Sequence, residues 1–361
     1  MNRPAPTPRF PTVASGLSPA WLTAVLGGEG REARSVHWEP VGTGQMCDTL
    51  RASIVWEPPG AGPPTVVVKL PATDPTSREA ARAVRAYEKE VRFYQQLAPT
   101  LPVRPPRCWL ADLDEMDTTR FVLCLEDLAP ARAGDQLAGC RPDQAQVAVD
   151  ELVRLHAPRW ADPSLQDLPW LHQDPAEQAA FLGELLPVLW TGFQDRYASV
   201  LAPVILETGH RLFDRLDRYL APTATPLTVI HGDYRLDNLL SDEDGQAPSR
   251  CAVCDWQTCR TGAGPEDLGY FLGASLLPED RRAHEERLVA RYHAGLLDNG
   301  VRDYPLERCW VDYRHGAWGG LVMAVAASML VQRTPRGDQM FLCMAERHAH
   351  QALEIDPAGP A

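Results

Sequence analysis

The segment VIHGDYRLDNLL, residues 229–240, places a run of polar side chains between two apolar ends. Its middle contains His231, Asp233, Arg235 and Asn238, and valine, isoleucine and leucine residues flank it. Apolar ends of this kind anchor a loop at the edge of a core, whereas a plain surface loop does not need them. We therefore interpret the segment as a functional loop that the core holds in place.

The spacing within this loop indicates phosphoryl transfer. Asn238 lies five residues after Asp233, and His231 lies two residues before it, as in the loop motif H-R-D-L-x-x-x-N. The reaction requires a carboxylate that accepts the proton of the attacking hydroxyl and an oxygen ligand for Mg²⁺ on the same loop. A further carboxylate is expected just downstream, and Asp255, at the end of the apolar run CAVCD, fits that requirement.

A lysine that would hold nucleotide phosphates is expected upstream of this loop. Lys69 lies inside the β-branched run TVVVKLP, where a lysine is costly to bury unless it is paired. The following helix offers Glu88 and Glu90, and helical periodicity favours Glu90 as the inward partner while leaving Glu88 open. The alternative is a lysine at a strand end whose ammonium group reaches solvent.

A glycine pair precedes this lysine. The stretch VGTGQM, residues 41–46, supplies Gly42 and Gly44, and glycines allow backbone amides to approach phosphates closely. An ordinary hairpin turn is the alternative interpretation of the same two residues.

Hydrophobic periodicity divides the chain into a strand-rich first third and a helical remainder. We expect strands over 35–42, 49–57, 65–71 and 118–128 and one helix over 76–97. Later helices are expected over 142–156, 175–190, 196–220, 265–276, 279–298 and 305–353, with a short strand over 249–257. This order predicts an α+β chain with a β-rich lobe over residues 1–127 and a mainly helical lobe over residues 128–361.

Composition narrows the class of protein. The chain has 361 residues, a net charge of −13 and a pI of about 5.2, which disfavours a nucleic-acid-binding protein. Nine scattered cysteines indicate reduced thiols and a cytoplasmic protein. No apolar stretch reaches the length of a membrane span, and the proline-rich start is not typical of a signal peptide.

Taken in order, VGTGQM, VVVKL, YEKEVRFYQQL, LEDLAP, HGDYRLDN and CDWQ resemble the aminoglycoside phosphotransferase and choline kinase superfamily. The resemblance is strongest to its bacterial phosphotransferase and ecdysteroid-kinase-like branch. It implies a bilobal protein-kinase-like fold, a β-rich N-lobe and a helical C-lobe. By this resemblance Asp233 is the catalytic base, Asn238 and Asp255 bind magnesium, and Lys69 contacts phosphates. The corner after FVLCLE becomes the hinge, where Glu126 and Leu128 offer backbone contacts to the base of the nucleotide.

One departure from protein kinases concerns the acceptor. Asp267 follows Asp255 by only 12 residues and already begins a predicted helix, so no long activation segment fits between them. Protein substrates are therefore disfavoured, and a small molecule with a hydroxyl group is expected. Arg235 could contact a phosphate or an anionic substrate, and Asp267 could cap the helix or brace the loop.

We therefore predict a Mg²⁺-dependent small-molecule kinase that uses ATP or GTP and phosphorylates an antibiotic or a hydroxylated metabolite. The alternative from another class is a non-catalytic protein of kinase fold that binds nucleotide or another ligand. The acceptor, the choice between ATP and GTP, and the oligomeric state cannot be read from helical periodicity.

Overall fold

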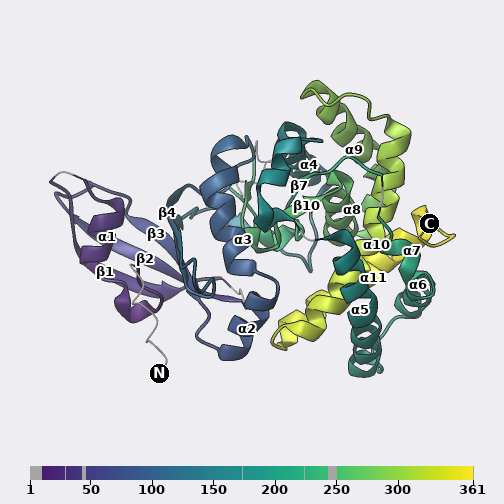
Figure 1. Ribbon diagram of the computed structural model, residues 1–361, viewed down its shortest axis with the longest axis horizontal. Coiled ribbons are helices and arrows are strands. Elements are labelled where there is room, and N and C mark those ends of the chain that lie inside the picture. The colour runs from purple at the N-terminus through teal and green to yellow at the C-terminus, as the bar shows by residue number, and fades with distance from the viewer. Residues whose placement is uncertain are drawn as a thin grey trace. The chain divides into compact units, whose positions relative to one another are not determined.

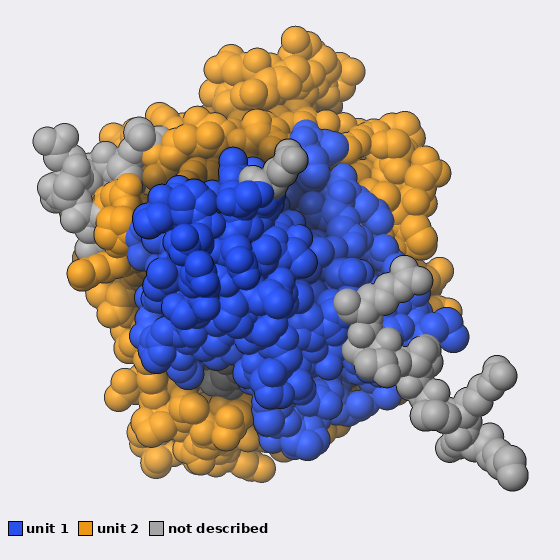
Figure 2. All heavy atoms as spheres, turned by 90° about the vertical axis from the view of Figure 1, so that its left-hand side faces the viewer, with its two compact units in different colours: residues 1–100, 105–129, 255–258 blue, residues 101–104, 130–254, 259–361 orange. Residues whose placement is uncertain are grey.

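The computed structural model describes residues 10–28, 30–42, 46–172, 174–222, 224–242 and 250–360. Within them the chain forms two compact units, coloured separately in Figure 2. Unit 1 comprises residues up to 100, residues 105–129 and the four residues Asp255–Thr258. Unit 2 comprises residues 101–104, 130–254 and those from 259 onward. Each unit is thus built from separate stretches of chain.

Unit 1 is organised around a five-stranded antiparallel sheet in the order β1-β2-β3-β5-β4. The strands are β1 (Glu32–Pro40), β2 (Cys47–Glu57), β3 (Thr65–Pro71), β4 (Cys108–Leu113) and β5 (Phe121–Glu126). Their valine, leucine and isoleucine content suits a pleated, half-buried surface. Strand β5 corresponds to the strand expected over 118–128, and it pairs with β4. Strand β4 was not predicted, because its apolar run is shorter.

The two faces of this sheet are covered differently, because successive side chains of a strand point to opposite sides. Helix α1 (Pro19–Leu26) buries Leu22 and Leu26 with Val66 and Val68 on one face. Lys69 lies in register with Leu123 of β5 and Thr49 of β2, so its side chain belongs to the opposite face. Helix α3 (Ala86–Arg92) contacts β4 and β5 and stacks Tyr87 on Phe121, 4.4 Å between ring centroids.

The prediction of one continuous helix over 76–97 was wrong. The chain forms α2 (Pro75–Ala83), then α3, then a π-helical turn over Phe93–Leu97. Arg85 adopts a left-handed conformation, φ 56°, which interrupts the ladder of helical hydrogen bonds between α2 and α3. Val84, which directly follows α2, is 41% exposed.

Unit 2 is mainly helical, and most of its helices begin with proline at the first or second position, where no backbone donor is needed. They are α4 (Pro142–His156), α5 (Pro175–Tyr197), α6 (Pro203–Phe213), α7 (Leu216–Tyr219), α8 (Gly264–Ser275), α9 (Pro278–Asp298), α10 (Leu306–Leu330) and α11 (Pro335–Ile355). Helix α10 packs against α8, α11 and α5 and forms the centre of the apolar core (Figure 1). The expected helix 196–220 is interrupted before Pro203, and the expected helix 305–353 divides into α10 and α11.

Short strands in unit 2 hold the loop of residues 231–238, which contains Asp233 and Asn238. Strand β7 (Thr228–Ile230) pairs with β10 (Arg260–Gly262), and β8 (Leu239–Ser241) pairs with β6 (Arg132–Ala133) and β9 (Ala252–Val253). Of the strand expected over 249–257, only the two residues of β9 form a strand within the described residues. The loop thus leaves one small sheet and enters another, which fixes both of its ends.

The α+β class predicted from the sequence is confirmed, since an antiparallel five-stranded sheet precedes a mainly helical region. Across the described ranges, no helix is both long and apolar enough to cross a membrane.

Candidate active site

In unit 1 the structure brings Lys69, Glu90 and Asp255 together. The ammonium nitrogen of Lys69 lies 2.6 Å from Glu90 Oε1 and 3.1 Å from Asp255 Oδ1. Glu90 projects from α3 and its side chain is fully buried. Glu88, the alternative partner, instead pairs with Arg85. Arg85, with its left-handed φ of 56°, directly precedes α3, the helix that carries Glu90.

These contacts keep the lysine charged. Burial by itself lowers the pKa of Lys69, but the carboxylates of Asp255 and Glu90 outweigh it and raise that pKa well above its usual value. Burial raises the pKa of Glu90, and the charge of Lys69 opposes that rise. A buried carboxylate is tolerated when it is paired and hydrogen-bonded, as Glu90 is here.

Asp255 is held in an uncommon backbone conformation. Its φ is 65°, in the left-handed region that residues other than glycine rarely adopt. The next residue, Trp256, is fully buried and stacks on Phe93, with ring centroids 3.7 Å apart and planes 8° from parallel. Backbone strain of this kind persists when the surroundings fix the residue, and it is common at functional sites.

In unit 2 the loop after β7 is pinned by Asp267, which lies in the first turn of α8. Asp267 Oδ2 accepts from the backbone N–H of His231 at 2.6 Å, and Oδ1 accepts from that of Gly232 at 2.9 Å. Gly232 has φ 82°, which its missing side chain allows. Burial favours protonation of Asp267, but contacts with His156 and His231 hold its pKa below the usual range, so it remains an acceptor.

Three neighbours hold the Asp233 carboxylate by hydrogen bonds. Arg235 Nε lies 3.1 Å from both oxygens, Tyr270 OH donates to Oδ1 at 2.8 Å, and Asn238 Nδ2 donates to Oδ2 at 3.0 Å. Burial and the charge of Asp233 raise the pKa of Tyr270 well above its usual value, so the phenol stays a neutral donor. The carboxylate is therefore oriented by three donors, and its side chain is about one-fifth exposed.

Arg235 is itself fixed between two carboxylates. Its guanidinium bridges Asp233 and Asp237, and it also contacts the sulfur of Met340. Burial opposes the charged form, yet Asp233 in particular raises the pKa of Arg235 above its usual value. A permanently charged group beside Asp233 suits the binding of a phosphate oxygen.

The predicted metal ligands have the oxygen chemistry that Mg²⁺ prefers. Asn238 donates its amide nitrogen to the backbone oxygen and to the carboxylate of Asp233, and this orientation leaves the amide oxygen for a cation. Asp255 supplies a carboxylate that is 35% exposed. No cluster of three His, Cys, Asp or Glu ligands occurs among the described residues.

The other predicted site residues lie in unit 1. Gly42 has φ 81° and open space where a side chain would be, whereas Gly44 lies outside the described residues. Glu126 ends β5, its backbone N–H bonds to Arg107, and Leu128 follows two residues later. Their expected contacts with a nucleotide base remain a prediction.

Sequence reasoning missed two residues that support the loop. Tyr270 lies one helical turn after Asp267, and that spacing alone places both on one face of α8. Gln136 is fully buried, accepts from Leu236 N–H at 3.0 Å and donates to the Ala274 carbonyl at 2.7 Å. It comes from an irregular segment, where no periodicity marks a buried side chain.

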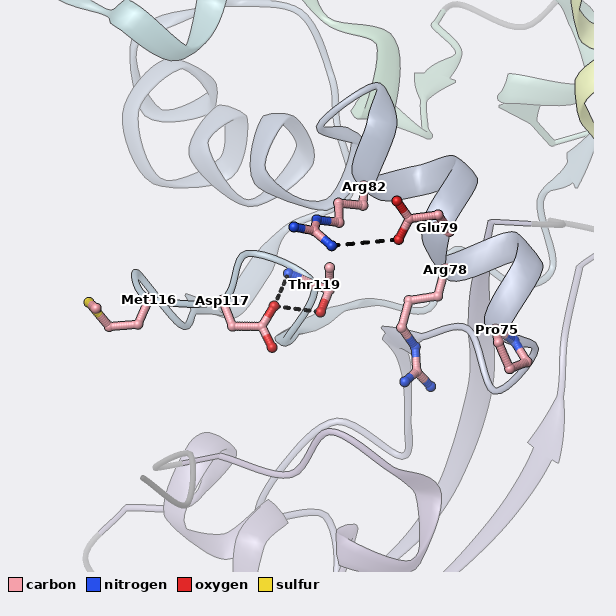
Figure 3. Close-up of a pocket in the computed structure, with 7 residues that line it drawn as sticks. All are labelled: Pro75, Arg78, Glu79, Arg82, Met116, Asp117 and Thr119. Carbon is pink, nitrogen blue, oxygen red and sulfur yellow. Dashed lines mark hydrogen bonds and ion pairs between the residues drawn. The ribbon is translucent and has the colours of Figure 1, made fainter. Parts of the chain in front are cut away.

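An open pocket of about 530 Å³ lies elsewhere in unit 1, between α2 and the β4–β5 turn. Figure 3 shows the residues that line it. Its charged groups already have partners: Arg78 donates to the Ala72 carbonyl, and Arg82 pairs with Glu79. None of the predicted site residues lines it. This pocket is therefore separate from the Lys69 cluster of unit 1.

A buried lysine paired with two carboxylates, an Asp–Asn loop and an α+β framework are together typical of kinase-like phosphotransferases. Residues 49–302 match the model of the ecdysteroid kinase-like family, and the chain belongs to that family. The matched range includes Lys69, Glu90, Asp233, Asn238 and Asp255. No curated protein matches the chain in sequence.

Solved structures with similar folds share little sequence with this chain. A choline kinase from Cryptosporidium parvum has a TM-score of 0.56 at 11% identity, covering 90% of this chain and 92% of its own. The GDP and kanamycin complex of an aminoglycoside phosphotransferase has a TM-score of 0.51 at 12% identity, covering 93% and 97%. An ethanolamine kinase from Plasmodium vivax has a TM-score of 0.51 at 9% identity, covering 88% and 83%. The resemblance to this superfamily is thereby confirmed at the level of fold.

Proposed function

We propose that this protein is a Mg²⁺-dependent kinase that transfers the γ-phosphoryl group of ATP or GTP to a hydroxyl of a small molecule. The observation that carries the proposal is the Asp233 carboxylate, which Arg235, Tyr270 and Asn238 orient by hydrogen bonds on a loop that Asp267 braces. Membership of the ecdysteroid kinase-like family supports the same reaction class.

Each residue then has a defined task. Asp233 accepts the proton of the acceptor hydroxyl as its oxygen bonds to the γ-phosphorus and the nucleoside diphosphate leaves. Lys69, held by Glu90, contacts phosphate oxygens of the donor. Asn238 and Asp255 would hold Mg²⁺, which neutralises charge on the phosphoryl oxygens when it is bound. Positioning and electrostatics, rather than covalent chemistry by the protein, provide the acceleration.

Arg235 must rearrange for Asp233 to accept a proton. Its Nε lies 3.1 Å from both carboxylate oxygens of Asp233. An acceptor hydroxyl needs one of those oxygens, so Arg235 transfers part of its hydrogen bonding to the incoming phosphate. Tyr270 and Asn238 can remain in place, because each uses a single oxygen of the carboxylate.

The acceptor is a small molecule with a free hydroxyl, such as a nucleoside antibiotic, macrolide, sugar, amino alcohol or sterol. The short connection from Asp255 to Asp267 supports this class, since it leaves no platform for a peptide. The proteins with similar folds are named for choline, ethanolamine and aminoglycosides, which are also small molecules.

The test is a coupled assay of nucleotide consumption with Mg²⁺ across hydroxylated antibiotics and metabolites. At least one acceptor should stimulate turnover, with either ATP or GTP, and Asp233→Asn should lose at least about 100-fold in kcat while still binding nucleotide. Near-normal kcat in that variant would refute the assignment of Asp233 as the base. Nucleotide binding without turnover by any acceptor would identify a non-catalytic nucleotide-binding protein instead. Labelled ATP with cell extract, separated by size, distinguishes protein from metabolite acceptors.

A further inference from the structure

Gln257 lies in the four-residue segment Asp255–Thr258, where the chain returns to unit 1. The proposed reaction gives this glutamine no role. We infer that Gln257 is a positioning residue that holds Glu90 in place for Lys69 and so sets the affinity for the phosphates of the donor. The inference rests on the proposed function and adds to it a determinant of nucleotide binding.

Gln257 completes the hydrogen bonding of Glu90. Its side-chain nitrogen Nε2 lies 3.3 Å from Glu90 Oε2, while Lys69 occupies Oε1. The same nitrogen lies 3.5 Å from the sulfur of Cys47 at the start of β2. The two oxygens of one buried carboxylate are thus divided between Lys69 and Gln257. Because Glu90 is fully buried, loss of either donor leaves part of a charge unpaired.

The orientation of the Gln257 amide follows from its neighbours. An ionised carboxylate can only accept hydrogen bonds, so the group that faces Glu90 must be the amide nitrogen. The nitrogen is committed to Glu90 and Cys47, and Gln257 is 7% exposed. This geometry makes Gln257 a support for Glu90 rather than a further ligand for the cation.

The neighbouring residue anchors this support. Trp256 stacks on Phe93, which directly follows α3, the helix that carries Glu90. Asp255, on the other side of Trp256, contacts the same lysine as Glu90 does. Lys69 therefore contacts both Glu90 and Asp255, and Gln257 contacts Glu90 from the same segment as Asp255. The Trp256–Phe93 stack joins that segment to the end of α3. The stack thus lies directly after the helix that carries Glu90.

The test combines two substitutions at position 257 with a double-mutant cycle. Gln257→Leu keeps the volume and removes the donor, and we expect about a 10-fold weaker affinity for Mg-ATP with kcat changed less than KM. Gln257→Glu places a second carboxylate beside Glu90 and should weaken affinity further than leucine does. If Gln257 acts through Glu90, adding Gln257→Leu to Glu90→Leu should change affinity less than about twofold.

Two outcomes would overturn the inference. Multiplicative effects in the cycle would mean that Gln257 does not act through Glu90. Mg-ATP affinity in Gln257→Glu equal to or above wild type would mean that position 257 faces the cation. Gln351→Leu is the matched control, because this buried glutamine of unit 2 contacts Gly269 and Tyr313; it should lower thermal stability without changing nucleotide affinity.

Affinity measured by calorimetry separates this inference from the proposed function. Wild-type protein that binds no nucleotide would refute the proposed function, and this inference with it. Wild-type protein that binds Mg-ATP normally, with effects that multiply in the cycle, would refute the role of Gln257 alone. Activity relative to Asp233→Asn tests the reaction without involving position 257.

Discussion

The brace formed by Asp267 makes a quantitative prediction about the Asp233 loop. Asp267→Asn keeps the shape of the side chain but leaves one acceptor oxygen for two backbone donors, those of His231 and Gly232. One of these N–H groups then faces an NH₂ group that can only donate. The loop must shift to relieve that contact, and Asp233 shifts with it.

The expected magnitude follows from the hydrogen bonds. A hydrogen bond to a charged group contributes roughly 1.5–3 kcal/mol, and an unmatched buried donor adds to the loss, so unit 2 should lose about 2–4 kcal/mol of stability. A displacement of the base by about 1 Å costs on the order of 100-fold in kcat. Nucleotide affinity should change less than kcat, because Lys69, Glu90 and Asp255 belong to unit 1, and only Asn238 of the proposed nucleotide and metal ligands lies on the shifted loop.

The assay is steady-state kinetics together with denaturant unfolding, and Asp312→Asn is the control. Asp312 is also buried in unit 2 and accepts from Thr225, Tyr304 and Arg308, away from the loop. The control should lose comparable stability and keep kcat. Wild-type kcat in Asp267→Asn, or an equal loss of kcat in Asp312→Asn, would refute the role of Asp267 as a specific brace.

Two further predictions concern Tyr270 and the ring that stacks on it. Tyr270→Phe keeps the stacking on His348 and removes one hydrogen bond to Asp233, so kcat should fall about 10-fold with KM nearly unchanged; unchanged kcat would remove Tyr270 from the site. Burial lowers the pKa of His348 from 6.5 to about 4, so below pH 6.5 the unfolded state binds a proton that the folded state does not. Stability is therefore fully present above pH 6.5 and lost as pH falls toward 4, by about 2 kcal/mol between roughly pH 7.5 and 5. Denaturant unfolding at both pH values should show a smaller pH-dependent loss in His348→Asn than in wild type, and an equal loss would contradict the assignment.

Periodicity and motif spacing predicted the α+β class, the main strands and the pairing of Lys69 with a glutamate of the next helix. They predicted less where single residues decide the path of the chain. The left-handed Arg85 divides one expected helix in two, and nothing in the local pattern distinguishes that residue from its neighbours. The roles of Gln136 and Gln257 were not predicted, because a buried glutamine is identified by its hydrogen-bond partners, and these lie far away in the sequence. The position of Tyr270 on the same face of α8 as Asp267 could have been predicted from their helical spacing.

The four-residue return Asp255–Thr258 has a consequence for dissecting the molecule. The half that holds the lysine cannot be excised as one continuous piece, because a fragment ending near residue 129 would lack Asp255, Trp256 and Gln257. Such a fragment would expose the Phe93 ring face and leave one oxygen of Glu90 without its donor. Gene fragmentation and domain exchange at that boundary should therefore yield an incomplete half, and a functional exchange must carry the downstream segment as well.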